Sequence, residues 1–266
     1  MKAEICSYLK AECPWADTLL WLNSTDSTNL RAKELARQGA PHGTLMIAGK
    51  QTAGRGRLGR SFDSQEGKGV YLSLILRPGC EPSQMMHLTC AVGVAMCHAI
   101  EKVCGIEIGL KWINDLVYQG KKLGGILTEL AVDPATGLVD YAVVGIGINC
   151  LQTREDFPQE LQDIAASLSV VTGTSVSPAR LAAAMVEALL ETDKYLFTHK
   201  KALMDSYRAR CVTLGKQVQI LRLDTVRPGK ALDIDDDGAL LVELPDGSRE
   251  FVSSGEVSVR GMYGYL

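Results

Sequence analysis

The chain has 266 residues, of which 46% are hydrophobic, and this length can bury a sizeable core in one domain or two. Its 28 lysines and arginines against 31 aspartates and glutamates give a formal net charge of −3. This balance lacks the overall basicity of a dedicated nucleic-acid binder, so any anion site must be a local concentration of positive charge.

The first fifteen residues hold no apolar segment long enough for a signal peptide, because charged side chains interrupt them. No apolar run approaches the ~20 residues that a bilayer-crossing helix needs. The eight cysteines form no CxxC pair, which is typical of reduced thiols. The sequence therefore predicts a cytoplasmic protein without a membrane partner.

One group of side chains, His87, Cys90, Cys97 and His98, resembles a set of metal ligands. A helix predicted over 83–104 separates His87 from His98 by about 16 Å, at ~1.5 Å per residue. One tetrahedral ion with bonds of ~2 Å cannot span that distance. We therefore expect core thiols and surface histidines here, and no metal site built from a cluster of side chains.

Helices and strands are expected to alternate through the first two hundred residues. A glycine-rich stretch, Gly54–Gly69, has little periodicity, and a long structureless loop inside a compact domain is usually functional. In chain order the expected elements are a helix from Ser27 or Thr28 to Gly39, strands over Leu45–Gln51 and Val70–Leu76, a helix over 83–104, strands near Ile108–Trp112, Leu123–Val132 and Leu138–Asn149, helices over 159–168 and 178–197, and a helix ending near Arg210.

After Cys211 the pattern changes to short alternating segments separated by tight-turn signals such as Asp237-Gly238 and Asp246-Gly247. This pattern predicts a small all-β module, built as a barrel. The fold class is therefore α+β, with a mixed sheet and flanking helices over 1–212 and the β-module over 213–266. The expected strands of the module are Val218–Leu223, Ala231–Ile234, Ala239–Glu243, Glu250–Ser253 and Val257–Arg260.

Arginines alternate with glycines in the segment Gly54–Arg60 (GRGRLGR). Backbone amides and guanidinium groups in such a loop can both approach an anion closely. The GxxxxGK[ST] spacing of a P-loop is absent. Taken alone, the segment is compatible with phosphate binding and, about equally, with a solvated surface loop. An RNA-binding role is disfavoured because no aromatic residues are interleaved.

Three further segments carry residues suited to a ligand site. Lys111–Asp115 (KWIND) ends a predicted strand with a cation and with groups that can hold hydrated Mg²⁺, although an ordinary turn would also explain it. Paired glycines inside strand-like sequence indicate a close ligand or backbone, or else β-bulges. Ser27-Thr28-Asn29 begins a helix and could be only a cap. The glycines are Gly124, Gly125, Gly145 and Gly147.

These segments occur together and in an order that resembles the biotin–protein ligase family, over about Trp21 to Arg260. The motifs that carry the resemblance are Asp26–Asn29, Gln51, Gly54–Arg60, Lys111–Asp115, Lys122–Leu127 (KLGGIL) and Gly145–Asn149 (GIGIN), with Val257–Arg260 at the end of the β-module. The resemblance implies a catalytic domain related to class II aminoacyl-tRNA synthetases and an SH3-like carboxy-terminal domain.

The resemblance also implies an activity, an ATP-dependent biotin–[biotin carboxyl-carrier protein] ligase with Mg²⁺ as cofactor and a biotin carboxyl carrier protein or domain as acceptor. Biotin would be bound by Ser27, Thr28, Asn29, Gln51, Gly54, Arg55, Gly56, Arg57, Lys111, Gly124, Gly125, Gly145 and Gly147, with Arg55 and Lys111 as catalytic cations. ATP and the adenylate would be bound by Arg57, Arg60, Phe62, Asn114, Asp115, Asn149 and Arg260, with Mg²⁺ near Asp115. Phe62 stands where relatives often carry a tryptophan over the adenine.

Biotinyl adenylate is hydrolysable, so the loop Gly54–Gly69 is expected to be mobile without ligand and to close over the adenylate. Only about twenty-five residues precede the Ser-Thr-Asn motif, so we expect a ligase without a winged-helix DNA-binding domain or repressor role. A monomer and a homodimer are both compatible with the sequence.

Two alternatives remain beside the biotin ligase. A lipoate or octanoate ligase or transferase shares the catalytic fold and a central lysine, but the arginine–glycine loop and the SH3-like domain favour biotin. A non-catalytic nucleic-acid-binding module would use the arginines of 55–60, and its affinity would fall steeply with salt. That second alternative leaves Lys111, the paired glycines and the β-module unexplained.

Overall fold

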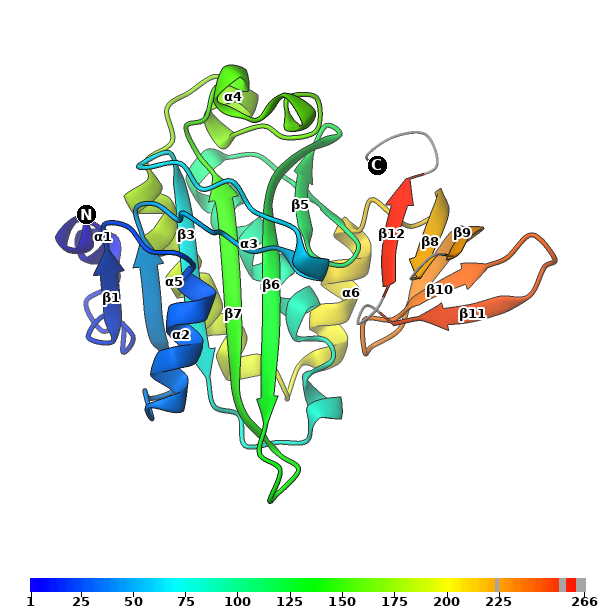
Figure 1. Cartoon of the computed structure of the whole chain (residues 1–266), viewed down its shortest axis with the longest axis horizontal. Coiled ribbons are helices and arrows are strands. Elements are labelled where there is room, and N and C mark those ends of the chain that lie inside the picture. Colours follow the sequence, from blue (N-terminus) through cyan, green and yellow to red (C-terminus); the bar gives the residue numbers. More distant parts are fainter. Residues whose placement is uncertain (223–224, 254–256, 262–266) are drawn as a thin grey trace.

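A seven-stranded sheet forms the centre of this computed structural model, which describes residues 1–222, 225–253 and 257–261, the last five as backbone only (Figure 1). The strands lie in the order β1-β2-β3-β7-β6-β5-β4, and all neighbours are antiparallel except β1 and β2. The expected mixed sheet is therefore confirmed. Its strands are β1 (Leu19–Leu22), β2 (Thr44–Ala48), β3 (Gly69–Leu76), β4 (Gly109–Lys111), β5 (Asp115–Tyr118), β6 (Lys121–Val132) and β7 (Val139–Asn149).

Helices cover both faces of this sheet (Figure 1). Helices α3 (Leu88–Cys104) and α5 (Pro178–Tyr195) pack together on one face, while α2 (Thr28–Arg37) packs on the other against Ile75, Tyr141 and Val143. Strand β3 is buried at every position, because a strand covered on both faces needs a continuous apolar run. The remaining helices are α1 (Lys2–Tyr8), α4 (Leu168–Thr172) and α6 (Lys200–Arg210).

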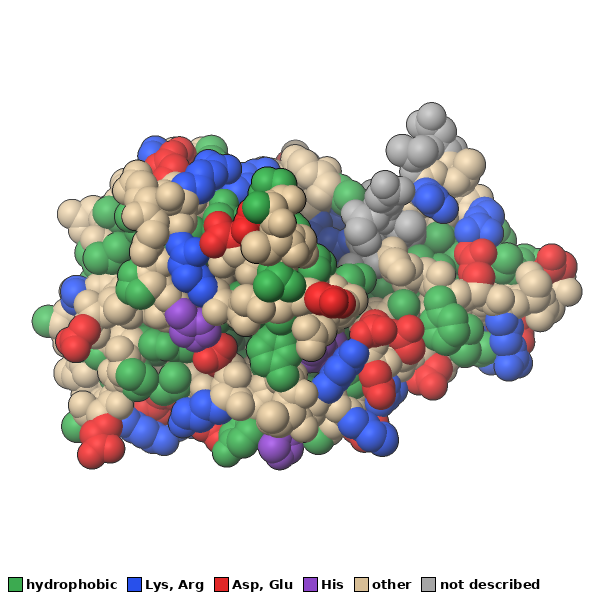
Figure 2. All heavy atoms as spheres, turned by 90° about the horizontal axis from the view of Figure 1, so that it is seen from below, with side chains coloured by type: hydrophobic (Ala, Val, Ile, Leu, Met, Phe, Trp, Pro, Cys, Tyr) green, Lys and Arg blue, Asp and Glu red, His purple; other side chains and the backbone are tan. Residues whose placement is uncertain are grey.

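A second, five-stranded antiparallel sheet follows α6 and has the order β11-β10-β9-β8-β12. It projects from the body of the molecule, and both signs of charge are intermixed over the face seen in Figure 2. The expected all-β module is confirmed. Its strands are β8 (Gln217–Arg222), β9 (Thr225–Ile234), β10 (Leu240–Glu243), β11 (Arg249–Val252) and β12 (Val257–Gly261).

Trp112 connects the two sheets. Its indole Nε1 donates a hydrogen bond to the carbonyl of Gly238 at 2.9 Å, in the turn between β9 and β10. Its backbone N–H donates to Oγ1 of Thr213 at 3.0 Å. A side chain at Gly238 would approach Sγ of Cys90 to 3.1 Å, so this turn lies directly against α3. The β-module is therefore packed onto the segment Lys111–Asp115.

The helix predicted over 159–168 is wrong. Only a 3₁₀ turn, Gln159–Leu161, forms there, and α4 begins at Leu168. The backbone of Lys122 instead hydrogen-bonds the carbonyl of Ile164 at 2.7 Å and the N–H of Ala166 at 2.9 Å. These bonds pair residues 164–166 with β6, after a turn at residues 162–164, so tertiary pairing overrides the local helical pattern.

The surface position expected for His87 is also wrong, whereas His98 is exposed as expected. His87 is 1% exposed, and its Nε2 lies 2.8 Å from the carbonyl of Leu196. Burial lowers the pKa of its imidazole below the ordinary value. Within the described ranges, no group of three His, Cys, Asp or Glu could hold a metal ion. None of the helices in those ranges has the length and apolar character needed to cross a bilayer.

The sequence analysis did not predict α1, β1 or β5, and β2 ends three residues earlier than expected. Strand β5 lies where the Asn-Asp pair suggested a turn, because Asp115 pairs with Lys111 on one side and with Gly125 on the other. The turn is therefore confined to residues 112–114.

Candidate active site

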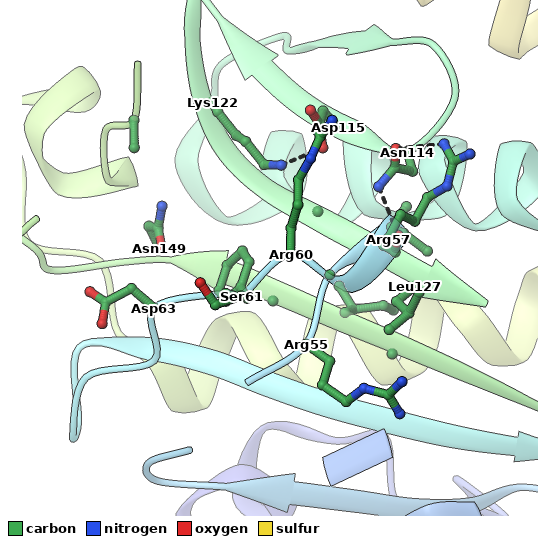
Figure 3. Close-up of a pocket in the computed structure, with 18 of the residues that line it drawn as sticks. Arg55, Arg57, Arg60, Ser61, Asp63, Asn114, Asp115, Lys122, Leu127 and Asn149 are labelled. Atoms are coloured by element: carbon green, nitrogen blue, oxygen red, sulfur yellow. Dashed lines mark hydrogen bonds and ion pairs between the residues drawn. The ribbon is translucent and has the colours of Figure 1, made fainter. Parts of the chain in front are cut away.

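A pocket of about 880 Å³ lies on the same face of the sheet as α2, beyond the N-terminus of that helix (Figure 3). This volume is near the upper end of the range for small-molecule sites. Three segments far apart in sequence border the pocket: the loop 54–63, the turn 111–115 and the segment 157–165. Strands β6 and β7 form its floor through Ile126, Leu127, Gly145 and Gly147.

The arginine–glycine loop is a short closed structure. The N–H of Gly56 donates to the carbonyl of Arg60 at 2.7 Å, and the N–H of Phe62 donates to the carbonyl of Gly54 at 2.9 Å. A side chain at Gly54 would approach the carbonyl of Phe62 to 2.4 Å, so glycine is required where the two arms of the loop meet. These bonds close the loop on itself, and the loop carries its arginines at the edge of the pocket.

The arginines of the loop point in different directions (Figure 3). Arg57 donates to Oδ1 of Asn114 at 3.3 Å, and burial lowers its pKa while the charge of Asp115 opposes that shift. A guanidinium nevertheless stays protonated in a protein. Arg55 points away from Arg57, with its Nη1 at 3.6 Å from a carboxylate oxygen of Glu129.

Two lysines add positive charge to the pocket. Lys111, in β4, is 7% exposed and lines the pocket together with Trp112. Lys122, in β6, also lines the pocket and forms an ion pair with Asp115. Lys122 belongs to the motif Lys122–Leu127 but was not predicted as a site residue; its position just before the paired glycines was the available signal. Lys111, Lys122, Arg57 and Arg60 thus make one end of the pocket strongly cationic.

Hydroxyl and amide groups gather at the N-terminus of α2. Oε1 of Gln51 accepts hydrogen bonds from the backbone N–H of Thr28 at 2.8 Å and from its hydroxyl at 3.0 Å. Nε2 of Gln51 donates to Ser64 at 2.8 Å, which ties the helix to the loop. Ser27 is 1% exposed and its side chain does not cap the helix, so the simple capping interpretation of this motif is wrong for Ser27.

Asn29 lies beneath the pocket in a polar cluster. Its Oδ1 accepts from Ser73 at 2.6 Å, and its Nδ2 donates to Glu129 at 3.0 Å. Glu129 also pairs with Lys33 at 2.9 Å. Burial alone would raise the pKa of Glu129, but the hydrogen bonds from Lys33 and Asn29 and the charge of Arg55 lower it overall. This carboxylate therefore stays ionised beside the loop.

Glycine is needed at three of the four strand positions, each time because of a different neighbour. A Cβ at Gly145 would lie 2.0 Å from Oδ1 of Asn29, and a Cβ at Gly147 would lie 2.6 Å from the ring of Phe62. A Cβ at Gly124 would lie 2.4 Å from the carbonyl of Gly147, whereas Gly125 has only ordinary contacts at 3.5 Å. Gly125, Gly145 and Gly147 line the pocket. Gly124 does not, and its lack of a side chain allows the backbones of β6 and β7 to lie close together.

Of the remaining predicted nucleotide residues, all whose side chains the structure describes line the pocket. Asn114, Asp115 and Asn149 all line the pocket, and Phe62 stacks edge-on against Tyr71 with a centroid distance of 6.4 Å. The side chain of Arg260 lies outside the described residues. The segment 157–165 was not predicted to belong to the site, because most of it was expected to form a helix. Its pocket-lining residues are Phe157, Glu160, Leu161, Asp163, Ile164 and Ala165.

Comparison with known proteins agrees with this geometry. Residues 21–149 match the Biotin/lipoate A/B protein ligase family, and residues 213–260 match the Biotin protein ligase C terminal domain. The bifunctional ligase/repressor BirA of Bacillus subtilis (strain 168) is 39% identical over 257 residues, covering 95% of this chain and 77% of that protein.

Two further relatives point the same way. The biotin--[acetyl-CoA-carboxylase] ligase of Mycobacterium tuberculosis is 33% identical, over 88% of this chain and 85% of that protein. The biotin protein ligase of Aquifex aeolicus, solved in complex with biotin and ATP, superposes with a TM-score of 0.77 at 32% identity, covering 91% of this chain and 98% of that one. The motifs, the fold and these similarities agree that the chain is an enzyme of the biotin–protein ligase family.

Proposed function

We propose that this chain condenses biotin with ATP to form biotinyl-5′-adenylate and then transfers the biotinyl group to a lysine of a biotin carboxyl carrier protein or domain. The observation that carries the proposal is the two-ended pocket. Its apolar floor lies beside the polar group around Ser27, Thr28 and Gln51, and its other end is cationic. An apolar acid with a polar ring, joined through its carboxylate to a nucleotide, has the matching distribution of chemistry.

In the first step a carboxylate oxygen of biotin attacks the α-phosphorus of ATP, and the bond to the β-phosphate oxygen breaks to release pyrophosphate. Two anions must approach each other, so the barrier falls when fixed cations neutralise the reacting oxygens. Arg57, Arg60, Lys111 and Lys122 supply these cations from one side of the pocket. Asp115 holds the ammonium of Lys122 in place through their ion pair.

In the second step the neutral amine of the acceptor lysine attacks the acyl carbon of the mixed anhydride, and AMP leaves with the bonding electron pair. The amine loses a proton in the process. The enzyme needs no nucleophile of its own, so catalysis rests on positioning and on charge stabilisation. The arginine–glycine loop is proposed to close over the adenylate and exclude water.

A Mg²⁺ ion bound with ATP would be held mainly by the phosphate oxygens, and this site offers it few protein ligands. Such an ion usually keeps several waters and uses one or two carboxylates. Asp115 is the carboxylate at the cationic end, while Oδ1 of Asn114 is engaged by Arg57 and Oδ1 of Asn149 by Gln152. When bound, the ion supplies charge neutralisation on the leaving pyrophosphate.

The proposed partners are the two small substrates and the carrier protein, without DNA, in keeping with the net charge of −3. All eight cysteines are free thiols, which supports the proposed cytoplasmic location. The division into domains at 212 and 213 is likewise a proposal. It is supported by the start of the second matched family at residue 213.

ATP–pyrophosphate exchange, measured with Mg²⁺ and biotin, lipoate, octanoate or no acid, tests the proposal. Exchange that depends on biotin is expected, and transfer is then measured as the mass increase of a purified carrier domain. Exchange with lipoate but not biotin would indicate a lipoate ligase instead. No exchange from folded protein would contradict the ligase proposal, and salt-sensitive nucleic-acid binding would then favour the binding-module alternative.

Lys122→Met should strongly reduce exchange, because it removes a cation from the reacting oxygens. Lys121→Met is the matched control, since Lys121 is adjacent but does not itself line the pocket, and its ammonium donates to the backbone carbonyl of Asp163. Trypsin cleavage at Arg55, Arg57 and Arg60 should slow when biotin and ATP are both present. Unchanged cleavage would contradict loop closure.

A further inference from the structure

Gln152 is a buried polar residue just beyond β7 that does not line the pocket but contacts a residue that does. Its side chain is 0% exposed, and its Nε2 donates to Oδ1 of Asn149 at 3.2 Å. Its own backbone carbonyl accepts from the hydroxyl of Ser167 at 2.7 Å, and Ser167 is also fully buried. Gln152 is therefore held from both sides next to the pocket wall.

The hydrogen bonds of Asn149 fix the direction of its amide. Oδ1 accepts from Gln152, and one hydrogen of Nδ2 is donated to the carbonyl of Ala166 at 3.2 Å. An asparagine amide carries two N–H donors. No described residue accepts the second hydrogen, and Asn149, although 4% exposed, lines the pocket. The amide thus offers a ligand an N–H group, while its oxygen is engaged by Gln152.

The other polar atom of the Gln152 side chain also indicates that its N–H to Asn149 is the group that matters. Its Oε1 is buried and has no hydrogen-bond partner among the described residues. Buried polar atoms are rarely left unpaired, and each one calls for an explanation. An apolar side chain of similar shape, such as methionine, would avoid this orphan acceptor. The one thing that glutamine supplies here and methionine does not is the N–H that holds Asn149.

We propose that Gln152 is a positioning residue that holds the Asn149 amide with its N–H toward the bound nucleotide, where it donates to a hydrogen-bond acceptor of ATP and of the adenylate. The inference rests on the proposed function for the identity of the ligand. It predicts that nucleotide binding, and not biotin binding, depends on Gln152.

Gln152→Glu is the sharpest variant, because glutamate has the same shape but its carboxylate cannot donate to Asn149 once ionised; the assay is therefore run at alkaline pH, since burial raises the pKa of a carboxyl. Either orientation of the Asn149 amide then sets its oxygen against another acceptor, the introduced carboxylate or the carbonyl of Ala166, so its N–H is no longer held toward the ligand. The KM for ATP in the exchange assay should then rise at least tenfold, with the KM for biotin unchanged within twofold. Gln152→Met removes the donor without introducing an acceptor against Asn149, so a rise of two- to fivefold is expected.

Gln162→Met is the matched control, because Gln162 also donates its side-chain amide, to the carbonyl of Phe157 at 3.1 Å, and neither lines the pocket nor bonds Asn149. Its KM for ATP should equal that of the unaltered protein. ATP analogues that each lack one acceptor, such as 7-deaza-ATP and 2′-deoxy-ATP, identify the partner of the N–H. One analogue should weaken binding to the unaltered protein and have no added effect on Gln152→Glu.

Direct ATP binding by calorimetry separates this inference from the proposed function. If the unaltered protein shows no biotin-dependent exchange, the ligase proposal fails, and the ATP affinities of the three variants still test Gln152. Equal ATP affinity in Gln152→Glu and the unaltered protein would overturn the inference. A parallel rise of both KM values with a lowered Tm would also overturn it, since that result indicates only a structural role.

Discussion

Replacing Gly124 by alanine and, separately, Gly125 by alanine tests whether adjacent glycines of one motif have different roles. Both lie in β6 and neither has a positive φ, so alanine suits the backbone at both positions. A Cβ at Gly124 would lie 2.4 Å from the carbonyl oxygen of Gly147, on the neighbouring strand β7. A Cβ at Gly125 would meet Asp115 and Lys122 at 3.5 Å, which is ordinary contact.

The magnitudes follow from these distances. At Gly124 the obstacle is backbone, so the two strands must separate by roughly 1 Å, and overpacking of this kind costs up to about 3 kcal/mol. Replacing glycine by alanine recovers about 0.4–1 kcal/mol of chain entropy at either position. We therefore expect Gly124→Ala to lower the free energy of unfolding by about 2 kcal/mol, or the Tm by roughly 4–8 °C. Gly125→Ala should be neutral or slightly stabilising.

Thermal unfolding followed by circular dichroism measures both variants, and the exchange assay measures their biotin KM. Gly125→Ala should fold normally yet raise the KM for biotin, because Gly125 lines the pocket. An unchanged Tm for Gly124→Ala, or equal losses of stability in the two variants, would refute the reasoning. Such a result would mean that β6 and β7 can separate locally at little cost.

Three other predictions concern residues buried around the site. Gly145→Ala should push Asn29 aside, since the added Cβ would lie 2.0 Å from its Oδ1, and we expect at least a tenfold weaker biotin affinity by calorimetry with the ATP affinity unchanged. Trp112→Phe should cost about 1–2 kcal/mol in urea unfolding, because the buried carbonyl of Gly238 loses its donor; an unchanged midpoint would contradict this. Because the pKa of His87 is lowered in the folded protein, the unfolded chain binds a proton first as pH falls below about 6.5. The contribution of neutral His87 to the free energy of unfolding is therefore present above that pH and is lost as pH falls below it. The stability difference between pH 7.5 and 5.5 should therefore shrink in His87→Gln, and an identical difference would contradict the prediction.

The short motifs could be identified from the sequence because the residue types within a few consecutive positions restrict what each segment can do. Alternating glycines and arginines restrict what the loop Gly54–Arg60 can be, and the structure places Arg57 and Arg60 at the pocket. The fold class and the family were likewise predicted, and the comparisons confirm both. Mainly apolar runs such as Val70–Leu76 predicted central strands, because a strand buried on both faces is predominantly apolar. The one polar side chain in this run, Ser73, is buried and hydrogen-bonded to Asn29.

The sequence could not distinguish residues whose roles depend on neighbours distant in the chain. Gly124 and Gly125 are identical in sequence terms, and only the pairing of β6 with β7 shows that one faces a carbonyl and the other the pocket. Gln152 has no local signal either, since its partner Asn149 ends a strand and its role depends on both being buried.

The sequence by itself therefore determined the fold class, most of the strands and helices between residues 27 and 210, and the ligase family. Only the tertiary structure decided that residues 164–166 pair with β6, that His87 is buried and that Lys122 lines the pocket. The physical reason is that propensity and spacing act over a few residues. Burial and hydrogen-bond partners are set by contacts between segments tens of residues apart, and their energies exceed local preferences.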